Sequence, residues 1–164
     1  MDPADTARKR LAELDDSHKH RALLYWSIYQ ELAAELGEAR AEAILMRAIE
    51  RRGVATGRAL FGAMAAATPA DVAAKFLSVS PGDGTLWPHQ VVRHGDGSVE
   101  IAVRRCPLKE AWTEAGLTAE EMTRMCRIAG RFDNGCFGEA PVGFEATTWA
   151  PGHAGCCTLT LRPR

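Results

Sequence analysis

The chain has 164 residues, 46% of them hydrophobic, which is enough apolar surface for one self-sufficient core. Its formal charge is −1 and its basic residues are spread along the chain, which argues against a nucleic-acid surface. Apolar runs are shorter than the ~20 residues of a membrane span, the first residues lack a signal-peptide core, and five cysteines favour reduced thiols over a disulfide framework. We therefore expect one cytoplasmic domain over 1–164, with no nucleic-acid partner and no membrane partner.

The first half, residues 1–80, is predicted to be helical. Apolar residues recur at every fourth position between His20 and Leu36, which predicts an amphipathic helix with Trp26 and Tyr29 beside its apolar stripe. We expect this helix to support a homodimer. The expected helices cover residues 20–36, 38–52, 54–67 and 70–79, with Gly37 and Gly53 as stops and Thr68-Pro69 opening the last one.

The second half, residues 81–164, opens with a glycine- and proline-rich loop followed by a predicted hairpin. Two runs rich in β-branched residues flank Gly95-Asp96-Gly97, a strong turn signal. In the second strand Val99, Ile101 and Val103 share one face, and we expect that face to meet the helical layer.

Two helices and another hairpin complete the chain. One helix opens at Cys106-Pro107, and the next opens at Thr118, where Glu121 completes a capping box. The final hairpin turns at 151–155. This order predicts an α+β fold, in which N-terminal helices pack on a small antiparallel sheet of two hairpins with two helices between them.

Cys106 is the candidate reactive group. Proline fits the first helical position, so Cys106 is predicted at the N-cap, where free backbone N–H groups and the helix dipole stabilise a thiolate. Arg104, Arg105 and Lys109 add positive charge nearby. These features favour a thiol with a lowered pKa, while a buried, packed cysteine is the alternative.

The other cysteines carry weaker signals. Cys156 and Cys157 are adjacent in a predicted strand, so their side chains point to opposite faces, and the alternation makes Cys157 the core member and Cys156 the freer thiol. Cys126 lies on an inward helix stripe where packing is the commoner outcome. Cys136 falls in a glycine-rich turn.

No cofactor is expected from sequence motifs. The cysteine spacings do not form the C-x-x-C pattern of a structural zinc site. A metal held by Cys106, Glu145 and Cys156 stays open as an alternative, because sequence spacing does not test residues that are distant in the chain.

Two further residues are candidates for proton transfer. His89 follows Trp87-Pro88 at the entry to the first strand, where an imidazole can carry a proton. Asp133 follows the helix of Cys126, where its carboxylate would either orient water or make an Asx turn.

The segment "CPLKEAWTEAGLTAEEMTRMCRIAGRFDNGCFGEA", followed by a strand pair with the pattern F…W-x-x-G-x-x-x-C, resembles the carboxy-terminal half of the L-2-amino-thiazoline-4-carboxylic acid hydrolase family. The matching elements are Cys106-Pro107 before a helix, Cys126 seven residues before Asp133, and Gly152 four residues before Cys156. The specific likeness covers roughly the last sixty residues, and the first half is similar in helical style.

This resemblance implies a hydrolase for a small 2-amino-thiazoline that bears a carboxylate. Water added at the ring carbon between sulfur and nitrogen would open the ring to N-carbamoyl-cysteine. The reaction needs a nucleophile or activated water, a proton donor for the departing sulfur and a cation for the carboxylate. The implied catalytic residues are Cys106, Asp133, Cys126 and Cys156, and the implied substrate-binding residues are Arg105, Trp87, His89 and Trp112.

The same closing hairpin also resembles the ligand-binding domain of the 4-vinyl reductase type. That resemblance implies a non-catalytic module for a small ligand or a metal, although Thr148 stands where that fold has one of its cysteines. A helical dimerisation module without ligand is a third possibility. Turnover of a small-molecule substrate separates the hydrolase from both.

Overall fold

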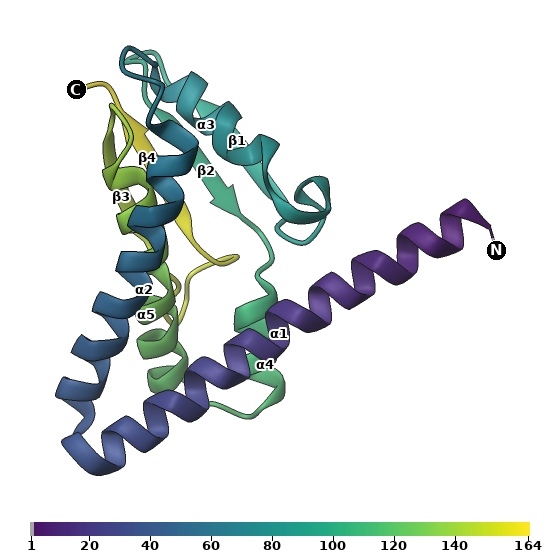
Figure 1. Cartoon of the computed structure of the whole chain (residues 1–164), viewed down its shortest axis with the longest axis vertical. Coiled ribbons are helices and arrows are strands. Elements are labelled where there is room, and N and C mark those ends of the chain that lie inside the picture. The colour runs from purple at the N-terminus through teal and green to yellow at the C-terminus, as the bar shows by residue number, and fades with distance from the viewer. Residues whose placement is uncertain (1) are drawn as a thin grey trace.

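The computed structural model describes residues 2–164, except for the side chains of Pro3 and Asp83. It confirms the α+β class, with a four-stranded antiparallel sheet of two hairpins and helices between them (Figure 1). The elements are α1 (Pro3–Leu36), α2 (Glu38–Phe61), α3 (Pro69–Ser78), the 3-10 turn η1 (Pro81–Gly84), β1 (His89–Arg93), β2 (Val99–Val103), α4 (Pro107–Glu114), α5 (Ala119–Gly138), β3 (Gly143–Thr147) and β4 (Thr158–Arg162). Within these residues no helix is both long and apolar enough to cross a bilayer.

The sheet has the strand order β1-β2-β4-β3, so the two hairpins meet where β2 pairs with β4. On β2, the side chains of Val99 and Ile101 are buried, and they pack in one cluster with Val72 of α3 and Phe137 of α5. The predicted contact between this face of the strand and the helical layer is therefore confirmed.

A β-bulge precedes β4 and reverses the predicted roles of two cysteines. The N–H of Cys156 donates to the carbonyl of Val103 (2.9 Å), while the N–H of Val103 donates to the carbonyl of Cys157 (2.8 Å). Two residues thus oppose one, which shifts the alternation of side chains. Cys156 is buried and Cys157 is half-buried, so the expectation from strand parity is wrong.

The helices are longer than their sequence signals indicated. α1 begins at Pro3, with Asp2 as N-cap, and not at His20. α2 runs through Gly53, so the expected separate helix over 54–67 is wrong in its start and its length. α5 continues to Gly138.

Glycines are needed in α2 and α5 because these two helices touch backbone to backbone. A Cβ on Gly53 would lie 2.1 Å from the carbonyl oxygen of Phe132, and one on Gly57 would lie 2.1 Å from that of Cys136. From the other side, a Cβ on Gly135 would lie 2.2 Å from the carbonyl oxygen of Glu50. Gly53 therefore permits helix packing and does not end the helix.

The apolar interior forms two clusters that α2 and α5 join. The first cluster gathers α1, α4 and the N-terminal parts of α2 and α5, and the second gathers the sheet, α3 and the C-terminal parts of those helices. Phe132 packs against both clusters. Figure 1 shows α1 diverging from the α2–α5 pair, with its N-terminal end projecting from the body.

Candidate functional site

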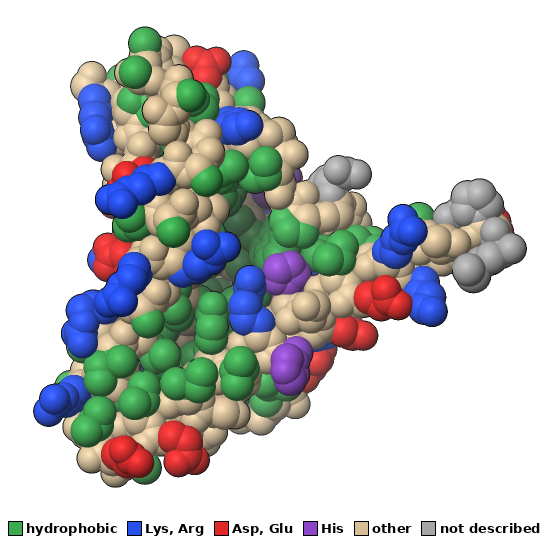
Figure 2. Space-filling view, viewed as in Figure 1, with side chains coloured by type: hydrophobic (Ala, Val, Ile, Leu, Met, Phe, Trp, Pro, Cys, Tyr) green, Lys and Arg blue, Asp and Glu red, His purple; other side chains and the backbone are tan. Residues whose placement is uncertain are grey.

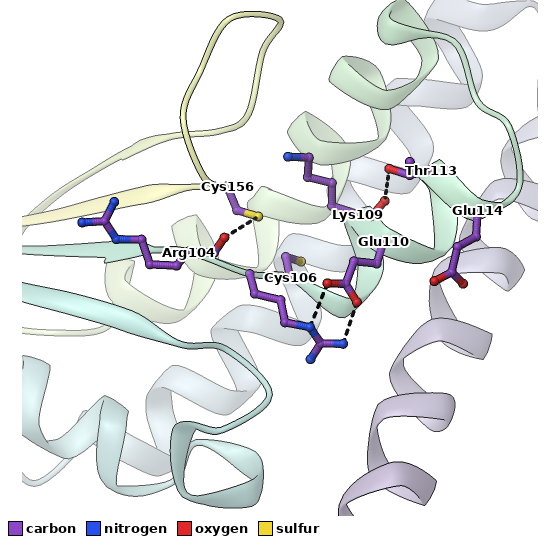
Figure 3. A pocket seen from close by; sticks show the side chains of 8 residues that line it. Arg104, Cys106, Lys109, Glu110, Thr113, Glu114 and Cys156 are labelled. Atoms are coloured by element: carbon purple, nitrogen blue, oxygen red, sulfur yellow. Dashed lines mark hydrogen bonds and ion pairs between the residues drawn. The ribbon is translucent and has the colours of Figure 1, made fainter.

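The junction between β2 and α4 forms the wall of a cavity of about 280 Å³. Figure 3 shows its lining, with the sulfurs of Cys106 and Cys156 on one side and the side chains of α4 along the other. Figure 2 shows a hollow with hydrophobic walls on one face of the molecule, between α2, η1 and α1. The lining residues of the cavity are Arg104, Arg105, Cys106, Lys109, Glu110, Thr113, Glu114 and Cys156.

Cys106 is the N-cap of α4, as predicted, and its side chain is half-buried. Burial raises the pKa of its thiol, and this effect outweighs the backbone N–H groups of Leu108 and Lys109 and the indole of Trp87, which all favour the thiolate. The negative charge of Asp133 raises the pKa further. The expectation of a lowered pKa is therefore corrected: the helix end contributes, but desolvation prevails.

Asp133 lies inside α5 and not in a turn after a helix. Burial raises the pKa of this carboxyl to about 7. Within residues 2–164 no donor is within hydrogen-bond distance of the carboxyl, and its charge raises the pKa of Cys106, Cys136 and Cys157. The structure thus brings a carboxyl that titrates near neutrality close to the Cys106 thiol.

Four cysteines interact electrostatically with one another near the β2–α4 junction. We call Cys106, Cys126, Cys156 and Cys157 the thiol cluster. Burial is the main cause that raises the pKa of each, to about 11 for Cys156 and to about 12 for Cys157. Mutual repulsion between the thiolates adds to this effect. At neutral pH the cluster is therefore a set of uncharged thiols.

The structure does not assemble the metal ligands considered from sequence. Glu145 is exposed on β3, where Arg162 pairs with it at 3.1 Å. Across residues 2–164, no group of three or more His, Cys, Asp or Glu side chains could hold a metal ion. Cys106 and Cys156 face one cavity without a carboxylate ligand from β3.

Arg105 lines the cavity, but its charge is already compensated. Its guanidinium donates to both carboxylate oxygens of Glu110 (2.8 and 2.6 Å), to Asp15 of α1 (2.8 Å) and to the carbonyl of Leu86 (3.2 Å). These bonds connect the β2–α4 junction to α1 and to the loop before β1. Arg105 therefore organises the wall of the cavity.

The tryptophans near the site differ in their burial and contacts. Trp112 is buried in the first cluster, and its indole N–H donates to the carbonyl of Ala22 (2.8 Å), so it braces α4 on α1. Trp87 is half-buried beside Cys106 and meets the ring of His18 edge-on at 4.5 Å. Trp149, just after β3, holds the ammonium of Lys109 over its ring at 4.8 Å. Its one sequence signal was its place in the F…W-x-x-G-x-x-x-C pattern.

Two histidines lie near the loop before β1. The Nδ1 atom of His89 lies 2.8 Å from the carbonyl oxygen of Trp87, and this contact holds the ring against the chain that enters β1. His89 is not among the residues that line the cavity. Burial lowers the pKa of His18, whose ring meets Trp87.

The fold and the cavity define a small α+β domain with an interior thiol cluster, and its family follows from the sequence model that matches residues 17–160. The chain belongs to the L-2-amino-thiazoline-4-carboxylic acid hydrolase family. The match begins within α1, so the likeness extends well beyond the last sixty residues.

Two further comparisons were made, with curated proteins and with solved structures. A search of curated proteins gives no match. The fold is similar to the crystal structure of the phenol-responsive sensory domain of the transcription activator PoxR with phenol, at 15% identity and a TM-score of 0.48. That alignment covers 86% of this chain and 73% of the sensory domain.

Proposed function

We propose that this protein is a hydrolase that opens a small cyclic amidine bearing a carboxylate, of the 2-amino-thiazoline class, by adding water to the ring carbon. Membership of the hydrolase family over residues 17–160 supports the reaction class. The observation that carries the choice of site is the carboxyl of Asp133, whose pKa burial raises to about 7, close to Cys106. A group that titrates near neutrality can both take and return a proton.

Asp133 is the proposed base. A protonated amidine is a cation, and a cation within about 4–6 Å favours the carboxylate of Asp133 and the thiolate of Cys106. The oxygen of water bonds to the ring carbon, and the carbon–sulfur bond breaks. The ring nitrogen keeps the proton that the amidinium already carries. Asp133 takes one proton of the water and gives it to the departing sulfur, and the second water proton leaves the new carbonyl oxygen for solvent. The product has a ureido group and a free thiol.

Cys106 is the proposed partner of the ring carbon. Its sulfur borders the cavity at the first turn of α4, and Cys156 lines the same cavity. Participation takes one of two forms, direct attack on the ring carbon or polarisation of the ring by the S–H group. Direct attack would leave a covalent adduct of the ring on Cys106 before water releases it.

Mass spectrometry tests this function. Wild type should convert L-2-amino-thiazoline-4-carboxylate to a product heavier by one water, and Cys106→Ala and Asp133→Asn should each lower the rate by at least about a hundredfold. Cys136→Ala and Glu114→Gln are the matched controls, a core thiol and a rim carboxylate, and both should retain turnover. Binding of the ring without turnover by wild type would refute the enzyme and favour a ligand-binding module.

We also propose a homodimer through α1. Tyr29 is buried in its own chain, and Trp26 stacks on it at 5.6 Å, so these two rings are not the free surface. The exposed apolar side chains are instead those of Leu24, 51% exposed, and Ile28, 40% exposed. Figure 2 shows hydrophobic side chains gathered over this part of α1.

The charges on either side of Ile28 favour an antiparallel arrangement of the two α1 helices. Arg21 and Glu35 each lie seven residues, or about two turns, from Ile28 on the same face. Both are exposed, and neither forms an ion pair with any side chain that the structure describes, which leaves out Pro3 and Asp83. In an antiparallel pair centred on Ile28, Arg21 of one copy meets Glu35 of the other, twice, whereas a parallel pair would oppose like charges.

A further inference from the structure

The cavity at the β2–α4 junction is lined by three cations, and two of them are already engaged elsewhere. Arg105 is paired with Glu110 and Asp15. Arg104 is exposed and bonds Gln90 of β1; in Figure 3 its guanidinium points away from the cavity, and only its backbone carbonyl faces Cys156, at 3.9 Å from the sulfur. Neither guanidinium is therefore available to an anion in the cavity.

Lys109 is the third cation, and its charge is not compensated. Its Nζ atom donates to the carbonyl of Gly155 (3.0 Å) and lies 4.8 Å from the ring centre of Trp149. Among the described side chains, which exclude those of Pro3 and Asp83, no carboxylate lies within ion-pair distance of it: Glu110 pairs with Arg105, and Glu114 pairs with Lys19. Neutral partners position the ammonium and leave its charge for a ligand.

Lys109 is also placed correctly with respect to Cys106. The two residues are three apart in the first turn of α4, a spacing that puts their Cβ atoms about 5–6 Å from each other. The charge of Lys109 lowers the pKa of both Cys126 and Cys156, so it acts across the thiol cluster. Both residues line the same cavity, so we expect a carboxylate on a ring beside Cys106 to face the ammonium.

We infer that Lys109 is the residue that selects substrates with a carboxylate, with Trp149 fixing the ammonium above its ring. The inference rests on the proposed function for the position of the ring and replaces Arg105 as the anion partner. The ligands that Lys109 favours are therefore small heterocycles that carry a carboxylate. Neutral analogues of the same shape should bind without help from Lys109.

Calorimetric binding of two ligands tests the inference without relying on turnover. The probes are L-2-amino-thiazoline-4-carboxylate and its carboxamide, which keeps the ring and removes the charge. Wild type should bind the carboxylate at least about tenfold more tightly, the equivalent of roughly 1.4 kcal/mol. Lys109→Met should abolish that preference by weakening only the carboxylate, and Lys109→Arg should retain part of it.

Arg104→Met is the matched control, since it removes a cation from the same rim, and it should keep the full preference. Two results with the variants would overturn the inference: the preference for the carboxylate survives in Lys109→Met, or it is lost in Arg104→Met. Two results with wild type would also overturn it: equal binding of the two ligands, or no binding of either at millimolar concentration. Melting temperatures confirm that the variants are folded. Carboxylate selection by Lys109 without ring opening would support this inference and refute the hydrolase, so the two failures are distinguishable.

Discussion

At the scale of single residues, desolvation and the helix end compete at Cys106. The N–H groups of Leu108 and Lys109 and the indole of Trp87 stabilise the thiolate, yet burial keeps the pKa of the thiol raised. The sequence identifies the N-cap correctly from Cys106-Pro107. It does not indicate burial, because burial depends on Trp87 and Asp133, which are distant in the chain.

Alkylation rates measure the outcome of this competition. Because only the thiolate reacts, Cys106 should react with iodoacetamide at pH 7 more slowly than free cysteine, and its rate should level off at a higher pH than that of free cysteine. A protonated cyclic amidine bound in the cavity should accelerate alkylation of Cys106 at pH 7. The ligand chosen should be too small to fill the cavity, so that iodoacetamide still reaches the sulfur. Peptide mapping identifies the modified thiol. Faster reaction than free cysteine would show that the helix end prevails.

The raised pKa of Asp133 makes the stability of the protein depend on pH. The folded chain keeps this proton up to about pH 7, whereas an unfolded aspartate releases it near ~4, so folding takes up a proton between these values. The free energy of unfolding should therefore fall, by a few kcal/mol at most, as pH rises from ~4 to ~7. Asp133→Asn should remove this fall, and the exposed Asp16→Asn should not. Urea unfolding at several pH values measures it.

Catalysis should have the opposite dependence on pH. If Asp133 acts as a base, it must be ionised, and kcat/KM should rise as pH increases through about 7. A flat profile across this range would remove Asp133 from the proton transfer.

At the scale of elements, the contact between α2 and α5 explains why sequence reasoning divided α2 at Gly53. Glycine is a common helix stop, and its use as a contact residue is visible only when the backbone of a partner lies against it. The signals for Thr68-Pro69 and for Thr118 with Glu121 were local, and both capping boxes are present in the structure. The capping signals were therefore reliable, whereas the meaning of Gly53 depended on a contact with a distant segment.

Gly53→Ala tests the close approach of these helices. The added methyl would have to move the Phe132 carbonyl, so we expect a loss of more than about 2 kcal/mol in the free energy of unfolding. Gly138→Ala in the same pair of helices is the control, because nothing lies within 4 Å of its added Cβ. That variant should stay within about 1 kcal/mol of wild type. Equal stabilities of the two variants in urea would contradict the packing.

At the scale of the whole molecule, alternation and turn signals predicted the α+β fold and the two hairpins, while the network of Arg105 was not predictable. Asp15 and Arg105 are 90 residues apart, and no local pattern links them. The helix start at Cys106-Pro107 identified Cys106, whereas the catalytic roles given to Asp133 and Cys156 came through the family resemblance. Lys109 and Trp149 gained meaning only from their contact in space.

Sedimentation velocity tests the proposed pair of α1 helices. Arg21→Glu should dissociate the dimer by placing like charges opposite each other, and the double variant with Glu35→Arg should restore it. Leu23→Ser is the control, because Leu23 is 40% exposed but lies on another side of α1 from Ile28. A monomeric wild type at high protein concentration would rule out the dimer.

The projecting end of α1 has a consequence for amide hydrogen exchange. From Asp5 to Glu13 the ion pairs are made within the helix itself, and Asp15 begins the bonds to the body through Arg105. Backbone amides protected only by local helical bonds exchange through fraying, and those between packed helices exchange through global unfolding. Protection should therefore rise along a single uninterrupted helix, from near zero in its first turns to the maximum around Ala22. α1 would thus combine a fast-exchanging arm and a slow-exchanging core segment without any break in its hydrogen-bonded backbone.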